Sequence, residues 1–231
     1  MTTPYETTKD ALLDAALMHV PFDGWSETTF KAAATDAGVE LALARAVCPR
    51  GAIDLALAYH ARGDAEMVAR LKSDDLPQRF SEKVAAGVRF RLEAVTDKEA
   101  VRRGTTLFAL PMHAADGAKA IWGTADKIWE ALGDTSDDVN WYTKRATLAG
   151  VYSATVLYWL GDDSTDNQAT WAFLDRRIED VMRIEKVKAQ VRDNKALSSL
   201  LAGPNWLLGQ IKAPSRLSNP DLPGMWGSRG E

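Results

Sequence analysis

The side chains best suited to catalysis or metal binding are few and scattered. The three histidines, His19, His60 and His113, fall in different parts of the chain. None has a Cys, His or carboxylate partner at a spacing typical of zinc or di-iron sites. The single cysteine, Cys48, has no adjacent basic partner, and the chain has no Gly-rich phosphate loop or nucleophile elbow. The sequence therefore predicts no catalytic residue, no metal site and no cofactor, although an enzyme with a convergent polar constellation stays the third-ranked hypothesis.

Two adjacent aromatic residues, Trp141 and Tyr142, stand in the first turns of a predicted helix. Successive helical residues point about 100° apart, so both rings cannot face the core together. Adjacent exposed aromatics are typical of a protein interface. The alternative is one core anchor beside a partly covered neighbour, and spacing alone leaves both interpretations open.

Residues 196–212 form a predicted amphipathic segment. Its apolar side consists of Leu197, Leu200, Leu201, Trp206, Leu207, Leu208 and Ile211. Half-burial of these seven side chains would contribute about 5 to 10 kcal/mol before ordering costs, enough for reversible membrane attachment. From Arg176 to Arg216 there are nine basic and four acidic residues, a balance that favours an anionic surface. The alternative is a last core helix, but Gly203-Pro204 and the predicted disordered tail favour a detachable element at least as much.

The N-terminal charge has the opposite sign. Residues 1–60 contain four basic and eight acidic side chains. Short helices predicted over 28–37 and 40–47, separated by Gly38, have helix-turn-helix spacing. The second of them carries one basic residue, Arg45, and no Asn or Gln for base edges. An acidic module lacks the counterion-release contribution to DNA affinity, so we expect no nucleic-acid binding and a helix-turn-helix kept for packing.

Apolar residues recur at helical spacing along the chain and predict an all-α protein. The first apolar stripe consists of Leu12, Leu13, Ala16, Leu17 and Val20. Further helices are predicted over 52–62, from Phe80 to Leu92, from a capping pattern at Thr96 to Leu110, around Ile121 to Leu132, and from a second capping pattern at Thr135. Residues 146–160 are apolar nearly all round and predict a central buried helix.

Four regions follow from this pattern. Residues 1–62 form a degenerate helix-turn-helix region, 63–195 a helical region, 196–212 the amphipathic helix and 213–231 a disordered tail rich in Pro, Gly and Ser. The single cysteine fits a reducing compartment, and no apolar run is long enough to span a bilayer. We therefore expect a cytoplasmic protein that meets the inner face of the cytoplasmic membrane peripherally.

Several motifs resemble one family, the lipid-binding accessory proteins of ubiquinone (coenzyme Q) biosynthesis. The similar residues are Leu110-Pro111, the stretch from Gly133 to Arg145, Ala149 to Tyr152, and Thr170 to Arg177. Their order and spacing match over roughly residues 105 to 210, and the N-terminal part matches more loosely.

The resemblance implies a TetR-like fold that has lost DNA binding, and a pocket for an isoprenoid quinone or phospholipid. It also implies a terminal helix that meets the membrane, and presentation of a quinone to the di-iron demethoxyubiquinone hydroxylase. The family's partner-contacting patch falls on Trp141, Tyr142 and Ile128. Pro204 interrupts the terminal helix that the family runs continuously.

We therefore expect a homodimeric, non-enzymatic lipid-binding protein. The predicted pocket residues are Phe108, Trp122, Leu148, Tyr152 and Val156. The alternative from another class is a TetR-type ligand-responsive transcriptional regulator, which would show salt-dependent DNA binding.

Overall fold

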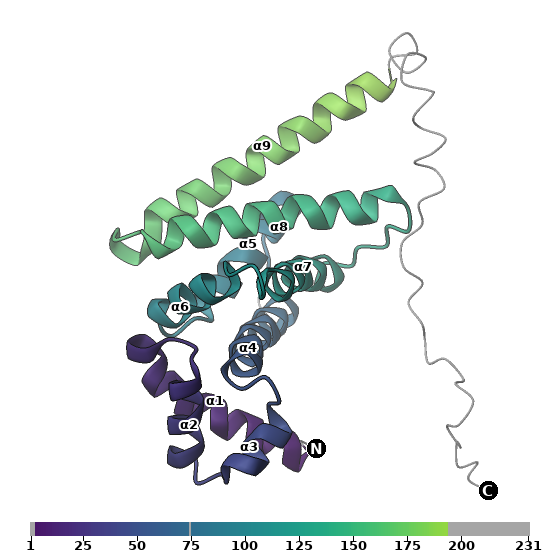
Figure 1. Cartoon of the computed structure of the whole chain (residues 1–231). Coiled ribbons are helices and arrows are strands. Elements are labelled where there is room, and N and C mark those ends of the chain that lie inside the picture. The colour runs from purple at the N-terminus through teal and green to yellow at the C-terminus, as the bar shows by residue number, and fades with distance from the viewer. Residues whose placement is uncertain (1–2, 74, 194–231) are drawn as a thin grey trace, which may run out of the picture.

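A computed structural model describes residues 3–73 and 75–193. Within these ranges the chain is built from helices and one 3-10 turn without strands, which confirms the predicted all-α class (Figure 1). The helices span Pro4–Asp23 (α1), Glu27–Asp36 (α2), Leu41–Val47 (α3), Ala52–Ser73 (α4), Phe80–Glu93 (α5), Lys98–Phe108 (α6), Ala114–Ala131 (α7), Val139–Leu160 (α8) and Gln168–Asp193 (α9), with η1 at Thr165–Asn167. The predicted helix at 196–212 and tail at 213–231 lie outside the described residues.

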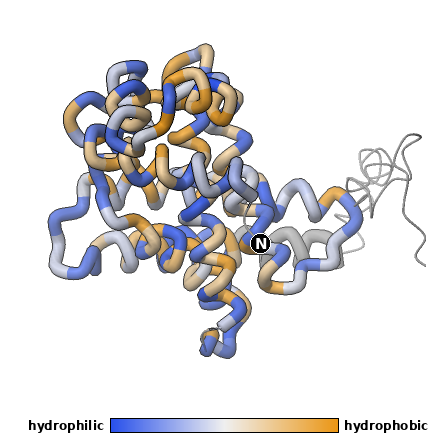
Figure 2. The backbone as a smooth tube through the Cα atoms, turned by 90° about the horizontal axis from the view of Figure 1, so that it is seen from below, coloured by the Kyte–Doolittle hydropathy of each residue, from blue (hydrophilic) through white to orange (hydrophobic). Residues whose placement is uncertain are grey.

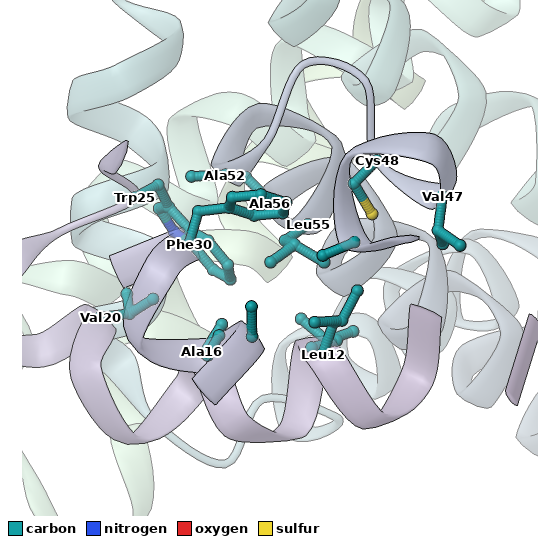
Figure 3. Close-up of a cluster of buried hydrophobic side chains, with 14 of the residues drawn as sticks. Leu12, Ala16, Val20, Trp25, Phe30, Val47, Cys48, Ala52, Leu55 and Ala56 are labelled. Carbon is teal, nitrogen blue, oxygen red and sulfur yellow. The ribbon is translucent and has the colours of Figure 1, made fainter. Parts of the chain in front are cut away.

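Helices α1 to α3 and the first half of α4 share one core. Figure 3 shows Leu12, Ala16 and Val20 of α1 facing Phe30 of α2 and Leu55 of α4. These five side chains are fully buried, so the apolar stripe of α1 packs as its spacing predicted.

The ends of α1 are set by local chemistry. Thr3 and Glu6 form a capping box in which the Glu6 amide donates to Thr3 Oγ1 at 3.2 Å and the Thr3 amide to Glu6 Oε2 at 2.9 Å. Gly24 ends the helix at φ 66°, a backbone conformation that favours glycine. Pro21 lies inside the last turn and does not end the helix.

Helix α4 is longer than predicted. The sequence pattern ended it at Arg62, before Gly63-Asp64, but the helix continues to Ser73. Gly63 lies inside the helix, and its lack of a side chain lets the Arg91 guanidinium pack against it. A Cβ at position 63 would lie 2.6 Å from Arg91 Nη1. The glycine therefore marks a close contact between helices rather than a break in α4.

The second core lies beyond this point, where α5, α7, α8 and α9 pack with the second half of α4. In Figure 1, α8 and α9 lie side by side across the top of the molecule. Two capping residues differ from the prediction: Asp97 caps α6 instead of Thr96, and Asp138 caps α8 instead of Thr135. In both helices the aspartate side chain accepts the second helical amide, which Thr at the predicted position does not reach.

Helix α8 is only partly the central buried helix that its composition predicted. Leu148, Val151 and Tyr152 are buried, but Leu157 and Tyr158 are 62% and 40% exposed. Figure 2 shows hydrophobic and hydrophilic residues interleaved along the helices of the bundle. None of the helices within the described ranges has both the length and the apolar character needed to cross a membrane.

Candidate functional site

A cavity of about 430 Å³ lies between the N-terminal core and helices α5 to α8. Its volume is within the range of small-molecule sites. Most of its wall is apolar and comes from five helices and the α1–α2 connection. Representative lining residues are Trp25, Ala56, Leu92, Val101, Ile121 and Val156.

Small residues in the surrounding helices leave this space open. Gly104 of α6 lines the cavity and would bring a Cβ no closer than 3.5 Å to Trp25 Nε1. Gly117 of α7 also lines the cavity and packs closely on α6, since a Cβ there would lie 2.7 Å from the Phe108 Cβ. Helices α6 and α7 therefore meet at Gly117 and diverge around the cavity.

The predicted pocket residues divide into two groups. Phe108, Tyr152 and Val156 line the cavity. Leu148 lies in the second core, and Trp122 packs against Trp141 with 6.0 Å between ring centroids. Helical periodicity placed α8 correctly but could not show where α6 and α7 diverge.

Arg91 is the charged side chain in the cavity wall among the described residues, and it is 5% exposed. Its Nε donates to Asp64 Oδ1 at 2.8 Å, and its Nη2 lies 3.2 Å from His60 Nδ1. Asp64 also receives Lys127 Nζ at 2.7 Å and the Thr124 hydroxyl at 2.8 Å. Burial alone would raise the pKa of Asp64, but the surrounding cations and hydrogen bonds outweigh burial and lower that pKa.

This network fixes the state of His60. Burial, reinforced by the Arg91 charge, lowers the pKa of His60 to about 4, so the ring is neutral at physiological pH. Because Thr124 donates its proton to Asp64, His60 Nε2 donates to Thr124 Oγ1 at 2.8 Å and Nδ1 accepts from Arg91. The cavity thus has one polar wall whose groups are largely satisfied by each other.

Neither Arg91 nor Asp64 was among the site residues predicted from the sequence. A signal was present, because Arg91 lies three residues after Val88 on the apolar stripe of α5. A charge on a buried stripe indicates a buried partner, although spacing does not tell which acid supplies it.

Trp141 and Tyr142 form the second candidate feature, at the start of α8. Both are half-buried, and their rings meet edge-on at 4.8 Å between centroids. The Arg145 guanidinium also lies 4.0 Å from the centre of the Trp141 ring, so this ring packs against a cation as well as against other aromatic rings. We call Trp122, Trp141 and Tyr142 the aromatic patch. Neither open interpretation fits fully, since both rings are partly covered and partly exposed.

Arg145 is fully buried beneath the aromatic patch. Its Nε donates to Asp126 at 2.5 Å and its Nη1 to Asp134 at 3.0 Å, while Nη2 is buried and has no hydrogen-bond partner among the described residues. Burial opposes ionisation of Asp134, but hydrogen bonds from Lys144, Ser136 and Arg145 outweigh it and lower its pKa to about 2. This ionic cluster holds the first turns of α8 against α7.

Ile128 does not belong to the aromatic patch. The resemblance placed it in the partner-contacting surface, but its side chain has no exposed area. It packs so closely on α5 that a Cβ at Gly87 would lie 2.9 Å from Ile128 Cγ2. A fully buried side chain cannot touch a partner, so the predicted role of Ile128 is wrong. The membrane-contacting residues predicted from Leu197 to Ile211 lie outside the described residues.

The sequence model of the COQ9 family matches residues 114–185, which include α7, α8 and much of α9. A protein from Drosophila melanogaster named "Ubiquinone biosynthesis protein COQ9, mitochondrial" is 31% identical over 185 residues, covering 78% of this chain and 56% of its own length. This chain is related to the COQ9 family. The corresponding proteins of Rattus norvegicus and Homo sapiens are 30% and 28% identical, with 81% of this chain covered in each case.

The chain spans about three fifths of the length of these curated COQ9 relatives, 56%, 62% and 61% respectively. Their names identify ubiquinone biosynthesis proteins, and none of these names states a catalytic activity. The predicted family resemblance is thereby confirmed.

A solved structure supports the fold. The TetR transcriptional regulator from Nitrosomonas europaea superposes with a TM-score of 0.62 at 20% identity, covering 75% of this chain and 97% of its own. This likeness confirms the predicted TetR-like architecture.

The COQ9 names overturn one prediction. The fly, rat and human proteins are each named mitochondrial, so the predicted location at the inner face of the cytoplasmic membrane is wrong. Charge and hydropathy describe how a segment meets a lipid surface. They carry no information about which membrane offers that surface.

Proposed function

We propose that this protein is a lipid-binding accessory factor of ubiquinone biosynthesis that holds an isoprenoid quinone in the cavity and presents it to the demethoxyubiquinone hydroxylase. The observation that carries the proposal is the apolar cavity of about 430 Å³ in a chain related to COQ9. Catalysis belongs to the partner.

The wall of the cavity favours a quinone over a phospholipid. Its one charged side chain among the described residues, Arg91, is already paired with Asp64. A phosphate headgroup would have to displace that pairing, whereas an uncharged quinone ring would not. The apolar remainder of the wall suits an isoprenoid tail.

The aromatic patch supports presentation to a partner. Trp141 and Tyr142 leave part of their large rings exposed on a helix that also lines the cavity through Tyr152 and Val156. Aromatic anchors of this kind supply much of the binding energy of protein interfaces. We further propose that the protein acts as a homodimer and meets the membrane peripherally through residues 196–212.

The cavity is tested by filling it. Gly104→Leu projects a side chain into the cavity, and Gly150→Leu places the same side chain on the exposed face of α8, where nothing lies within 4 Å of the new Cβ. Each protein is purified with its lipid and examined by native mass spectrometry. Gly104→Leu should lose the bound lipid while Gly150→Leu keeps it, and equal occupancy in both would rule out this cavity as the binding site.

The TetR-like fold makes a transcriptional regulator the second candidate. Helix α3 does not favour it, because Arg45 is ion-paired with Glu27 and stacks on Phe30 at 4.5 Å. Leu41 and Leu43 of the same helix are 43% and 50% exposed, where a DNA-reading helix would present polar groups. A footprint on promoter DNA at nanomolar protein and physiological salt would favour the regulator.

A further inference from the structure

One turn presents apolar side chains where turns are usually polar. The connection between α6 and α7, residues 109–113, exposes 45% of Leu110 and 77% of Met112. From Thr105 to Ala115 the chain has no Lys, Arg, Asp or Glu, although 26% of its residues are charged. Turns in water are generally built from Gly, Pro, Asn, Asp and Ser. An exposed apolar turn therefore indicates a contact surface.

This turn borders the cavity on both sides. Phe108 and Ala109 line the cavity before the turn, and Ala114 lines it after the turn. Ala109 and Ala114 are themselves exposed, as is Leu157 in the facing part of the wall. The apolar wall of the cavity thus continues without a charged residue onto the exposed surface of the 109–113 turn.

We propose that the 109–113 turn is the portal through which the cavity exchanges lipid with a bilayer, and that Leu110 and Met112 enter the apolar layer during the exchange. The inference rests on the proposed lipid-binding function and adds the route of entry. It assigns the turn a role separate from the aromatic patch and from residues 196–212.

A direct contact with the bilayer matters because exposing an isoprenoid chain to water is unfavourable. Each methylene that crosses open water is transferred out of an apolar phase, which is unfavourable. Exchange is therefore fast only where the rim of the cavity touches the apolar part of the bilayer. A charged rim would keep a layer of water between the two, whereas the 109–113 turn has no Lys, Arg, Asp or Glu and exposes Leu110 and Met112, with His113 as its one polar side chain.

The test measures transfer separately from binding. Vesicles of phosphatidylcholine and phosphatidylglycerol containing decylubiquinone are mixed with the full-length protein. At set times the vesicles are removed by flotation, and the protein-bound quinone is quantified by mass spectrometry. Met112→Glu should slow loading by about tenfold, equivalent to 1.4 kcal/mol in the barrier, because it places a charge at the bilayer contact. Co-sedimentation with vesicles should stay unchanged.

Met18→Glu is the matched control. Met18 lies on α1, is 73% exposed and does not line the cavity, so it should load at the wild-type rate. Both variants are also loaded from detergent micelles, where no bilayer has to be met, and should reach wild-type occupancy. Loading of Met112→Glu from vesicles at the wild-type rate would overturn the portal. So would a loss of loading from micelles, since the turn would then be part of the binding wall.

Failure of the proposed function would give a different result, because wild-type protein would then take up no quinone even from micelles.

A fluorescent label gives a second readout. Cys48 is the sole cysteine and is fully buried, so Met112→Cys and Met18→Cys each add one accessible thiol. An environment-sensitive label at position 112 should shift to the blue on vesicles and the label at 18 should not. A blue-shifted label at 112 before vesicles are added would mean that a second copy covers the turn, against the proposal.

Discussion

His60 shows how a single buried side chain couples the cavity to pH. The unfolded chain takes up a proton at His60 as the pH falls below 6.5, but the folded protein resists protonation until the pH reaches about 4. The unfolded state therefore binds more protons in this window, and stability falls as the pH falls. The shift corresponds to about 3 kcal/mol, lost between pH 6.5 and pH 4.

We expect His60→Gln to remove most of this dependence, because glutamine does not titrate. The free energy of unfolding by urea, measured at pH 7 and pH 4, should change less in the variant than in the wild type by about 3 kcal/mol. His113 is the control position, since it lies in the 109–113 turn outside the Arg91–Asp64 network. An identical pH profile for His60→Gln and wild type would show that His60 is not held neutral.

Trp141 and Tyr142 have different surroundings in the structure. Trp141 contacts Trp122 and the Arg145 guanidinium, so Trp141→Ala should lower both stability and affinity for the hydroxylase. Tyr142→Ala should lower the affinity by about 2 kcal/mol with a smaller change in melting temperature. Isothermal titration with the hydroxylase, with Thr143→Ala as the exposed neighbour, checks this. Normal affinity of Tyr142→Ala would remove the aromatic patch from the interface.

At the scale of elements, glycines inside helices differ in how much space a side chain would find there. A Cβ at Gly63 of α4 would lie 2.6 Å from Arg91 Nη1, whereas one at Gly123 of α7 would meet nothing within 4 Å. Gly63→Ala should destabilise the protein by about 2 kcal/mol, because it forces the buried guanidinium away from Asp64. Gly123→Ala should stabilise it by about 0.5 to 1 kcal/mol through helix propensity.

Chemical denaturation of both variants measures this pair, and each serves as the control for the other. Equal effects would mean that the Arg91 contact is easily rearranged. The circular dichroism spectrum should stay helical in both, so that a change in helix content is not mistaken for a change in packing.

The helices themselves were largely predictable, because apolar spacing and turn signals act over a few residues. The stripe of α1, the short α2 and α3, and the buried positions of α5 all follow from local periodicity. The extension of α4 past Arg62 did not follow, since Gly63-Asp64 looks like a helix end in the local pattern, and the Arg91 side chain that packs on Gly63 is 28 residues further along the chain. The cavity and the buried ion pair depend on such distant contacts, and sequence spacing does not encode them.

At the scale of the whole molecule, the predicted membrane element can be removed without touching the described core. Deletion of residues 196–212 should abolish co-sedimentation with anionic vesicles, because the apolar and basic side chains that favour the surface would be gone. The melting temperature should stay near that of the wild type, since both cores consist of residues before position 182. Full co-sedimentation of the deletion variant would place the membrane contact elsewhere.

The cavity also joins the N-terminal helices to the rest of the molecule. Helix α4 contributes Leu55 to the first core and Met67 to the second, and Trp25, between α1 and α2, forms part of the cavity wall. The Trp25 indole further donates to the Ala100 carbonyl of α6 at 3.1 Å. Loss of the α1–α2 connection would therefore leave the cavity without one of its walls, so the N-terminal module supports the cavity whatever else it binds.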